Sequence, residues 1–235
     1  MTGVTVVIPA YNAGAPFAAS LPTIADHFSL YRSGGYEFSY LIIEDGSSDS
    51  TRAIAQRFAR WRSNVRVVSH LCHRGVGAAM RTAFNETRAD FAIVLDPALA
   101  YAPATGMELV EALERENADI AIASSHVHGA TISLGDASRR AKLGVGGAYE
   151  ALVGMVRAYR VPAVKRLRFS SDGVAALPEL LARAIREGMY IVAVPAMPWN
   201  VARRSNARDA ILAFIAALKY FPIVAFGAPR KQEAC

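Results

Sequence analysis

The chain has 235 residues, of which 53% are hydrophobic, so it can build a large core and its composition excludes intrinsic disorder. The formal net charge of +6 favours anionic partners such as phosphates or an acidic membrane surface. No basic run interleaved with aromatic residues indicates a nucleic-acid groove, so nucleic acid is not an expected partner. The 2 cysteines form neither a disulfide framework nor a metal-ligand spacing, and no signal peptide precedes the first strand, which together predict a cytoplasmic protein.

Strands and helices alternate along the first half of the chain. Short apolar runs rich in β-branched residues predict strands at 4–8, 40–43, 65–69, 91–95 and 119–123. Helical spacing of apolar residues predicts helices at 15–31, 76–84 and 107–115, and a further helix with Ile54, Phe58 and Trp61 on its inner face. This alternation predicts an α/β fold with a mostly parallel sheet and right-handed crossovers.

The pattern is looser after Ser124. Residues 124–136 read as a loop that carries His126 and His128, residues 138–159 as a helix weakened by glycines, and residues 195–208 as an irregular basic segment. A helix at 175–187 and a strand at 190–194 are clearer. Residues 209–226 are very apolar but are interrupted by Pro222, which makes them a poor membrane span. They either lie at a membrane surface, which would make the protein membrane-peripheral, or pack back on the domain.

The stretch YLIIEDGSSDST, residues 40–51, combines the pattern of a buried strand with acidic side chains that can bind a ligand. Its apolar run ends at two carboxylates, Glu44 and Asp45. Acidic residues at the carboxyl end of a parallel strand lie at the edge where open α/β sheets bind ligands. The alternative is a solvated loop in which Asp49 or Ser50 caps the next helix.

Four motifs carry a family resemblance by their order and spacing: VTVVIPAYN, IIEDGSSDST, HRGVGAAMRTAF and IVLDPALAYAP. Together they resemble family-two glycosyltransferases of the GT-A fold, with a Rossmann-like sheet, over residues 4–124. Residues 176–221 are more loosely similar to the region after the core in dolichol-phosphate-mannose synthases and related polyprenyl-phosphate transferases. The resemblance implies one domain over 1–235, with a nucleotide-binding half (1–124), an acceptor half (125–208) and a C-terminal helix and tail (209–235).

The activity that this resemblance implies is sugar transfer from a nucleotide diphosphate sugar. A tyrosine can stack on a base, a carboxylate can accept a hydrogen bond from a ring N–H or a ribose hydroxyl, and glycines let a backbone approach closely. The implied nucleotide-binding residues are Pro9, Tyr11, Asn12, Glu44, Asp45, Gly75 and Gly77.

The chain departs from the family pattern in its second half. The family's DxD motif positions a divalent cation, but here it reads Asp96-Pro97-Ala98, so only the first acid is present. We expect Asp96 to hold Mg²⁺ or Mn²⁺ weakly, together with substrate phosphates. Ser125 stands where the family has an arginine, and the acceptor loop before residue 154 is shortened.

Other residues can compensate for the missing acid. The resemblance places Arg203 and Arg204 on the diphosphate, where guanidinium groups stabilise a leaving group. His126 is a candidate general base if the acceptor is a hydroxyl, whereas a lipid phosphate needs no base. A metal site at His126 and His128 is an alternative, although no third ligand is evident.

Three functions are compatible with these features. The first is an inverting glycosyltransferase that moves a sugar from a UDP- or GDP-sugar to a polyprenyl phosphate or a small acceptor, with Asp96, Arg203, Arg204 and His126 as catalytic residues. The second is a catalytically silent protein that binds a nucleotide sugar or acts as a scaffold. A nucleotidyltransferase is the third, but it would need a glycine-rich basic signature after the first strand, where this chain has Pro9-Ala10-Tyr11-Asn12.

Overall fold

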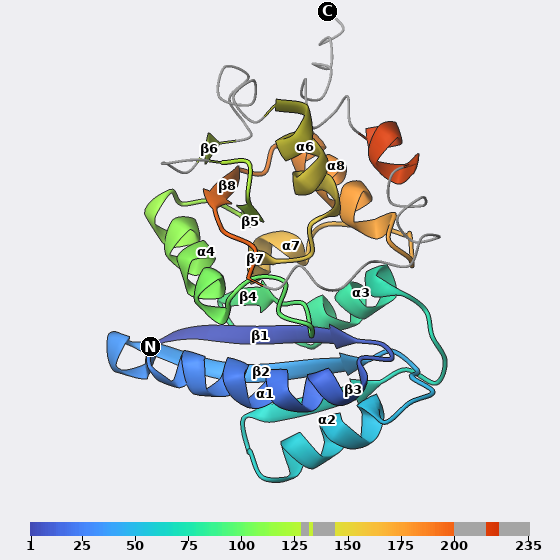
Figure 1. Ribbon diagram of the computed structural model, residues 1–235. Helices are drawn as coiled ribbons and strands as arrows, with labels where there is room; N and C mark the ends of the chain where they lie inside the picture. The colour runs from blue at the N-terminus through green and yellow to red at the C-terminus, as the bar shows by residue number, and fades with distance from the viewer. Residues whose placement is uncertain (128–131, 134–143, 200–214, 221–235) are drawn as a thin grey trace, which may run out of the picture.

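The computed structural model describes residues 1–127, 132–133, 144–199 and 215–220. Within them, the strands are β1 (Thr2–Ala10), β2 (Tyr36–Glu44), β3 (Val65–Ser69), β4 (Phe91–Val94), β5 (Ile120–Ser124), β6 (Ile132–Ser133), β7 (Arg157–Arg160) and β8 (Ile191–Pro195). The helices are α1 (Gly14–Ser29), η1 (Arg32–Gly34), α2 (Thr51–Arg60), α3 (Val76–Glu86), α4 (Pro103–Arg115), α6 (Gly144–Val153), α7 (Val161–Val164) and α8 (Ala176–Arg186). Residues 215–220 form a further helical turn without a label (Figure 1).

The described strands form a single sheet in the order β3-β2-β1-β4-β7-β5-β8-β6. β1 is parallel to β2 and β4, β2 to β3, and β5 to β8, whereas β7 and β6 are antiparallel to their neighbours. The predicted α/β fold with a mostly parallel sheet is therefore confirmed. The carboxyl ends of β1, β2, β4 and β5 lie at one edge of the sheet, and β7 brings its amino end, Arg157, to that same edge opposite Val94.

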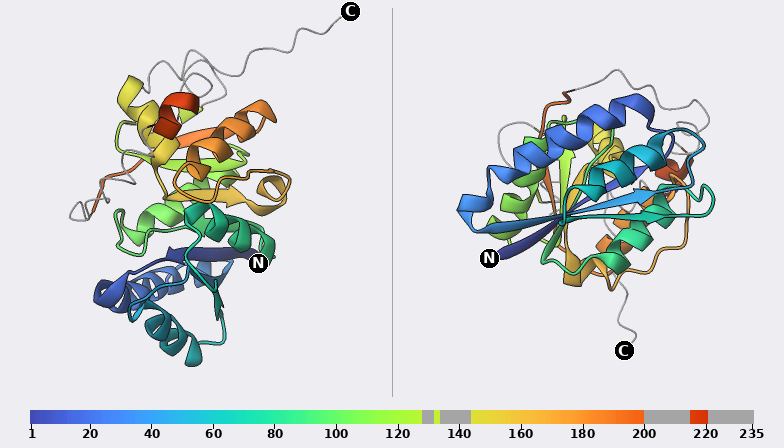
Figure 2. Two further views of the ribbon diagram at one scale, coloured as in Figure 1. Left: turned by 90° about the vertical axis from the view of Figure 1, so that its right-hand side faces the viewer. Right: turned by 90° about the horizontal axis from the view of Figure 1, so that it is seen from below.

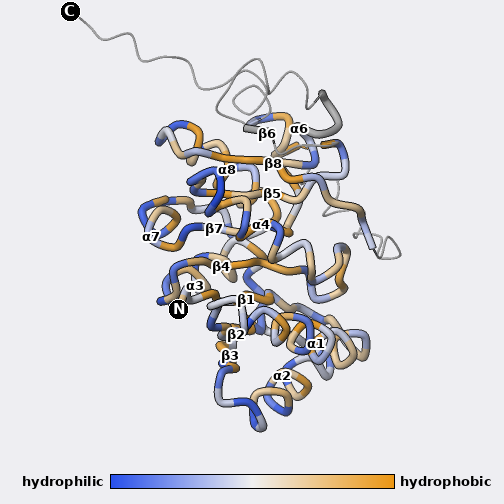
Figure 3. The backbone as a smooth tube through the Cα atoms, turned by 90° about the vertical axis from the view of Figure 1, so that its left-hand side faces the viewer, coloured by the Kyte–Doolittle hydropathy of each residue, from blue (hydrophilic) through white to orange (hydrophobic). Residues whose placement is uncertain are grey.

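Helices cover both faces of the sheet (Figure 2). Side chains alternate along β1, so Val6 and Ile8 join a core with α1, α2 and α4, whereas Val7 joins a core with α3, α6 and α8. The strands are apolar on both faces, and Figure 3 shows them as mostly hydrophobic segments. Burial of each large aliphatic side chain contributes about 1.5–3 kcal/mol, which makes this layered core the main source of stability.

Two predicted features are wrong. Trp61 is 78% exposed rather than inward-facing, because α2 ends at Arg60 and Trp61 already has non-helical backbone angles. Residues 154–159 of the helix predicted at 138–159 are not helical, because α6 ends at Val153 and Arg157–Arg160 form β7. These residues gain backbone hydrogen bonds to β4 and β5, which are remote in sequence and therefore invisible to a local pattern. The short strand β6, inside the predicted 124–136 loop, is also missed.

The apolar C-terminal stretch is described only at 215–220. There Ala216 and Ala217 are buried, whereas Ile215 and Leu218 are each 58% exposed. The described turn therefore packs partly on the domain and keeps an outer apolar side. Among the described residues, no helix combines the length and apolarity needed to cross a membrane.

Candidate functional site

The candidate site lies at the carboxyl edge of the sheet, where the loops after β1, β2, β4 and β5 meet. The ends of β1 and β2 are in register, with Ala10 opposite Glu44, and the Asp45 N–H donates to the Ala10 carbonyl at 2.9 Å. The sheet register therefore places the predicted residues after β1 next to the predicted carboxylates after β2.

Glu44 braces the loop after β2 from within, and Asn12 joins that loop to the loop after β1. The buried Glu44 carboxylate accepts hydrogen bonds from the Ser47 N–H at 2.5 Å and the Arg52 side chain at 2.7 Å. Burial alone would raise the pKa of Glu44, but these bonds outweigh it and hold the pKa below its ordinary value. The Asn12 side chain accepts from the Ser48 N–H at 2.9 Å, and Thr51 accepts from the Ala13 N–H at 2.8 Å. Both loops are thus held in one conformation.

Asp45 organises the loop of residues 70–75. Its carboxylate, 3% exposed, accepts from the Gly75 N–H at 2.7 Å and the Arg74 N–H at 3.1 Å. It also lies 2.5 Å from Nδ1 of His70 and 2.8 Å from Nδ1 of His73. Both carboxylate oxygens are therefore engaged by the chain itself, and a direct contact of Asp45 with a base or ribose stays a prediction.

Tyr11 is an exposed aromatic residue of this edge. Its ring is 40% exposed and stacks on the His73 ring, with centroids 3.6 Å apart and planes inclined by 19°. His73 therefore lies between Tyr11 and Asp45. Pro9, predicted beside the base, is buried inside β1 opposite Ile43. Of the residues predicted after β1, Tyr11 is the one whose ring can stack on a base.

The predicted glycines, Gly75 and Gly77, lie against another part of the chain. A Cβ at Gly77 would lie 2.1 Å from the Ser171 carbonyl oxygen, and one at Gly75 would lie 2.7 Å from the Asp172 carbonyl oxygen. Gly75 also has φ +98°, which a residue with a side chain rarely adopts. The close approach that these glycines permit is made here by residues 171–173, so their contact with a nucleotide stays a prediction.

Glu179 on α8 holds that approaching loop in place. Its buried carboxylate accepts from the Ser171 N–H at 2.9 Å, from the Ser170 N–H and from the Arg183 side chain at 2.8 Å. Burial would raise the pKa of Glu179, but these donors lower it to about 2. The carboxylate is therefore ionised across the physiological range and fixes the loop against α3.

Asp96 follows β4 at the centre of the edge. Its Oδ1 accepts from the Ala98 N–H at 2.7 Å, in a tight turn that Leu99 closes with φ +53°. No group of three metal-ligating side chains exists among the described residues. Within the described part of the chain the other Asp96 oxygen accepts no hydrogen bond, and Mg²⁺ is commonly bound by one or two carboxylates together with substrate phosphates and water. Asp96 thus fits a weakly held Mg²⁺ or Mn²⁺ that shares its ligands with a diphosphate.

Glu150 on α6 is a site residue that the sequence reasoning missed. Its Oε1 accepts from the Tyr101 hydroxyl at 2.7 Å and the Ser125 hydroxyl at 2.9 Å. Its Oε2 accepts from the Ser124 hydroxyl at 2.7 Å and the Ser125 N–H at 2.9 Å, and lies 3.0 Å from Nδ1 of His126. One carboxylate therefore joins the loop after β4 to the loop after β5.

The charge of Glu150 decides which ring nitrogen of His126 carries the proton. Burial would raise the pKa of Glu150, but the bonds from His126, Tyr101 and the two serines lower it to about 2. Because an ionised carboxylate only accepts hydrogen bonds, Nδ1 of His126 carries the proton and Nε2 of a neutral ring is a base. The sequence held one signal for this residue, since Glu150 is the sole acid between Asp136 and Asp172.

The structure brings together Tyr11, Asn12, Glu44 and Asp45 on one side of the edge, and joins His126 to the loop after Asp96 through Glu150 and Tyr101. Arg203, Arg204 and His128 lie outside the described residues, so their predicted roles at the diphosphate and as a metal ligand stay predictions.

Comparison with solved structures identifies the fold class of the protein. The chain is similar to the structure of glucosyl-3-phosphoglycerate synthase from Mycobacterium tuberculosis in complex with UDP, with a TM-score of 0.68 at 16% identity over 97% of this chain and 82% of that one. A second structure of that synthase, with Mn²⁺, UDP and phosphoglyceric acid, gives a TM-score of 0.66 at 18% identity over 98% and 80% of the two chains. The predicted GT-A fold is thereby confirmed.

The family follows from the sequence profile. Residues 5–162 match Glycosyl transferase family 2, and the chain belongs to that family. It is 35% identical over 115 residues to undecaprenyl-phosphate 4-deoxy-4-formamido-L-arabinose transferase of Edwardsiella ictaluri (strain 93-146), a match that covers 48% of this chain and 34% of that protein. The enzyme of the same name from Pseudomonas paraeruginosa (strain DSM 24068 / PA7) is 35% identical over 111 residues, covering 46% and 31%. The matches span about a third of these relatives' length, and they confirm the predicted resemblance to polyprenyl-phosphate transferases.

Proposed function

We propose that this chain is an inverting glycosyltransferase that moves a sugar from a nucleotide diphosphate sugar, with UDP as the nucleotide to test first. The observation that carries the proposal is the arrangement of the carboxyl edge, where Tyr11 and the loops braced by Asp45 lie on one side and the His126–Glu150 pair on the other. Family membership and the UDP complex of the structural neighbour support the donor class.

The donor binds in the nucleotide-binding half, residues 1–124. The exposed ring of Tyr11 offers a stacking face for the base once the His73 ring moves from it. Asp45 acts by fixing the backbone of residues 74–75, so that this loop has its shape before the nucleotide arrives. Preorganisation of this kind lowers the entropy that binding must offset.

The leaving diphosphate lies beside Asp96. A bound Mg²⁺ or Mn²⁺ supplies positive charge to the leaving diphosphate. Asp96 would hold that cation through the carboxylate oxygen that does not accept from Ala98, and the arginines at 203 and 204 would add guanidinium groups to the oxygens of the diphosphate.

The acceptor approaches from residues 125–208, with His126 as its general base. Nε2 of His126 removes the hydroxyl proton as the acceptor oxygen bonds to the anomeric carbon and the nucleoside diphosphate departs from the opposite side. Glu150 holds the ring through Nδ1 and stabilises the imidazolium that forms. A polyprenyl phosphate acceptor, as in the named relatives, carries its own anionic oxygen and reacts without this base.

The second candidate is a catalytically silent protein that binds a nucleotide sugar. The observation that favours it is Ala98, which leaves Asp96 as the one carboxylate of the motif. A catalytically silent protein would bind the nucleotide sugar without turning it over, so binding and turnover must be measured separately.

A polyprenyl phosphate acceptor requires contact with a membrane, so we propose a cytoplasmic, membrane-peripheral protein in which residues 209–226 supply that contact. The outward-facing Ile215 and Leu218 support such a contact. Truncation before Asp209 should reduce co-sedimentation with lipid vesicles, and equal co-sedimentation of both forms would assign the segment to core packing alone.

The deciding experiment has two stages. Calorimetric titration with UDP, GDP and their sugars, with and without Mn²⁺, identifies the donor class. A product assay then offers undecaprenyl phosphate or phosphoglyceric acid as acceptor. Product with either acceptor supports the transferase, binding without product supports the silent alternative, and absence of nucleotide binding rejects both.

A further inference from the structure

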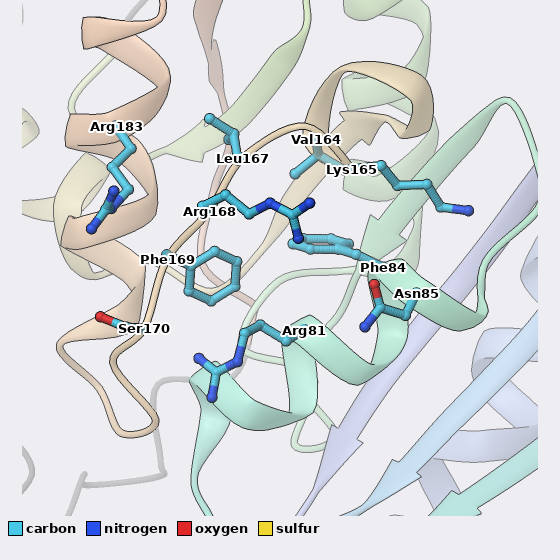
Figure 4. A pocket seen from close by; sticks show the side chains of 10 residues that line it. All are labelled: Arg81, Phe84, Asn85, Val164, Lys165, Leu167, Arg168, Phe169, Ser170 and Arg183. Carbon is cyan, nitrogen blue, oxygen red and sulfur yellow. The ribbon is translucent and has the colours of Figure 1, made fainter.

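A pocket lies away from the carboxyl edge, between α3, α8 and the segment that follows α7 (Figure 4). Its volume is about 240 Å³. Arg160, the last residue of β7, pairs with Phe91 at the start of β4. Helix α7 follows directly, so it begins at the amino edge of the sheet. From there the chain runs along α3 towards residues 171–173, and the pocket lies beside the second half of α3. It is therefore separate from the site described above.

The rim of the pocket is cationic. Arg81, Lys165, Arg168 and Arg183 line it, and none of its described lining residues is acidic. Arg81 pairs with Asp172 and Arg183 pairs with Glu179. The side chains of Lys165 and Arg168 make no hydrogen bond or ion pair within the described part of the chain. Two positive charges at the rim of this small cavity thus have no acidic partner among the described residues, which favours an anion there.

The floor of the pocket is apolar and well packed. Phe84, Leu167 and Phe169 are all buried, and the two phenylalanine rings lie edge to face with centroids 6.4 Å apart. The Arg81 guanidinium lies 5.3 Å from the Phe169 ring centroid, which limits its movement. Figure 4 shows Arg168 reaching over the middle of the pocket near Phe84, with Lys165 and Arg183 on opposite sides. The cations are thus arranged around a shaped, apolar base rather than spread over a flat surface.

We propose that this pocket binds a phosphate group, either of a small soluble phosphate ester or of a phospholipid head group. Guanidinium groups pair bidentately with phosphate oxygens, and Lys165 adds a fourth positive charge to those of the three arginines. The amide of Asn85 supplies a neutral donor at the rim. The volume is below the roughly 300 Å³ at which pockets begin to enclose drug-sized ligands, so it suits a phosphate with a small substituent rather than a whole nucleotide.

The test compares two pairs of charge-removing variants of the full chain. Lys165→Gln/Arg168→Gln removes the unpaired cations of the pocket, and both residues are exposed, so the fold is preserved. Arg57→Gln/Arg60→Gln removes the same charge from the exposed face of α2 and serves as the matched control. Lys165→Arg/Arg168→Lys keeps the charge and checks that charge is what matters.

Two probes distinguish the sources of the phosphate. Calorimetry with inorganic phosphate and glycerol phosphate measures soluble ligands, and co-sedimentation with phosphatidylglycerol–phosphatidylcholine vesicles measures lipid. We expect the pocket variant to weaken one of these at least about tenfold, with the control and the charge-conserving variant close to wild type. Loss of soluble phosphate identifies a free ester as ligand, and loss of vesicle binding alone identifies a head group. Binding by neither probe, or equal loss in the α2 control, overturns the proposal.

Discussion

The backbone N–H of Gly77 donates a hydrogen bond to the carbonyl oxygen of Asp172 at 2.6 Å, so the first turn of α3 is capped by the loop before α8. The Ala78 N–H shares that carbonyl at 3.3 Å. Helix N-termini leave N–H groups unsatisfied, and here part of this donor capacity is used by the chain itself. The same contact links the nucleotide-binding half of the chain, residues 1–124, to the acceptor half, residues 125–208.

Substitution of Gly77 by alanine should destabilise the fold by about 1–3 kcal/mol, because the new Cβ would lie 2.1 Å from the Ser171 carbonyl oxygen. Urea unfolding of the variant measures the change. Gly173→Ala is the matched control, since a Cβ there meets nothing within 4 Å. Equal stability of Gly77→Ala and wild type would show that the loop of residues 171–173 does not pack against α3.

Glu150→Gln should lower stability at pH 7 by about 1–3 kcal/mol, because the carboxylate accepts several hydrogen bonds that an amide cannot all replace. Its pKa is about 2 in the folded chain against an ordinary value of 4.5. A depressed pKa gives stability that is present above about pH 4.5 and is lost as the pH falls towards 2. The difference between variant and wild type should therefore shrink across that window.

Urea unfolding at pH 7, 4 and 3 checks this dependence on Glu150. Glu37→Gln, at an exposed position on β2, is the control and should show no pH-dependent difference from wild type. A gap between Glu150→Gln and wild type that stays constant down to pH 3 would contradict the assigned pKa.

Asp45→Asn should weaken UDP binding by about 1–3 kcal/mol, because the amide loses acceptors for the Arg74 and Gly75 N–H groups and the loop loses its fixed shape. Calorimetry with UDP measures the loss. The exposed Asp26→Asn is the control for charge. Unchanged affinity in Asp45→Asn would remove this loop from the nucleotide site.

His126→Gln should lower the turnover number by about 10²–10⁴-fold with a hydroxyl acceptor and leave turnover with polyprenyl phosphate close to wild type. The physical reason is that a hydroxyl must lose its proton, whereas a phosphate oxygen is already anionic. Steady-state kinetics with both acceptor types separate these cases. Equal activity of variant and wild type with every hydroxyl acceptor would exclude His126 as the base.

Asp96→Asn should abolish the enhancement of UDP binding by Mn²⁺, because it removes the one carboxylate of the motif. Titrations of UDP with and without Mn²⁺ measure this enhancement directly. If Asp96→Asn responds to Mn²⁺ as wild type does, the cation is held elsewhere in the chain.

Local patterns accounted for most of the first half of the fold. The strand predicted at 65–69 coincides with β3, and the helix predicted from residue 76 coincides with the start of α3. Helix α4 begins at Pro103, before the predicted residue 107, because proline suits the first helical turn but adds nothing to an apolar pattern. Strand β7 was missed because its stability comes from pairing with β4 and β5.

The sequence by itself determined the alternation of strands and helices, and with it the edge where Tyr11, Asp45, Asp96 and His126 follow their strands, because parallel strands all end on one side. Only the tertiary structure decided what these residues touch. It directed Asp45 to the loop of residues 70–75, set Gly77 against Ser171 and brought Glu150 to His126. Those contacts join segments far apart in the chain, so their energy depends on the packing of whole elements and leaves no local pattern to read.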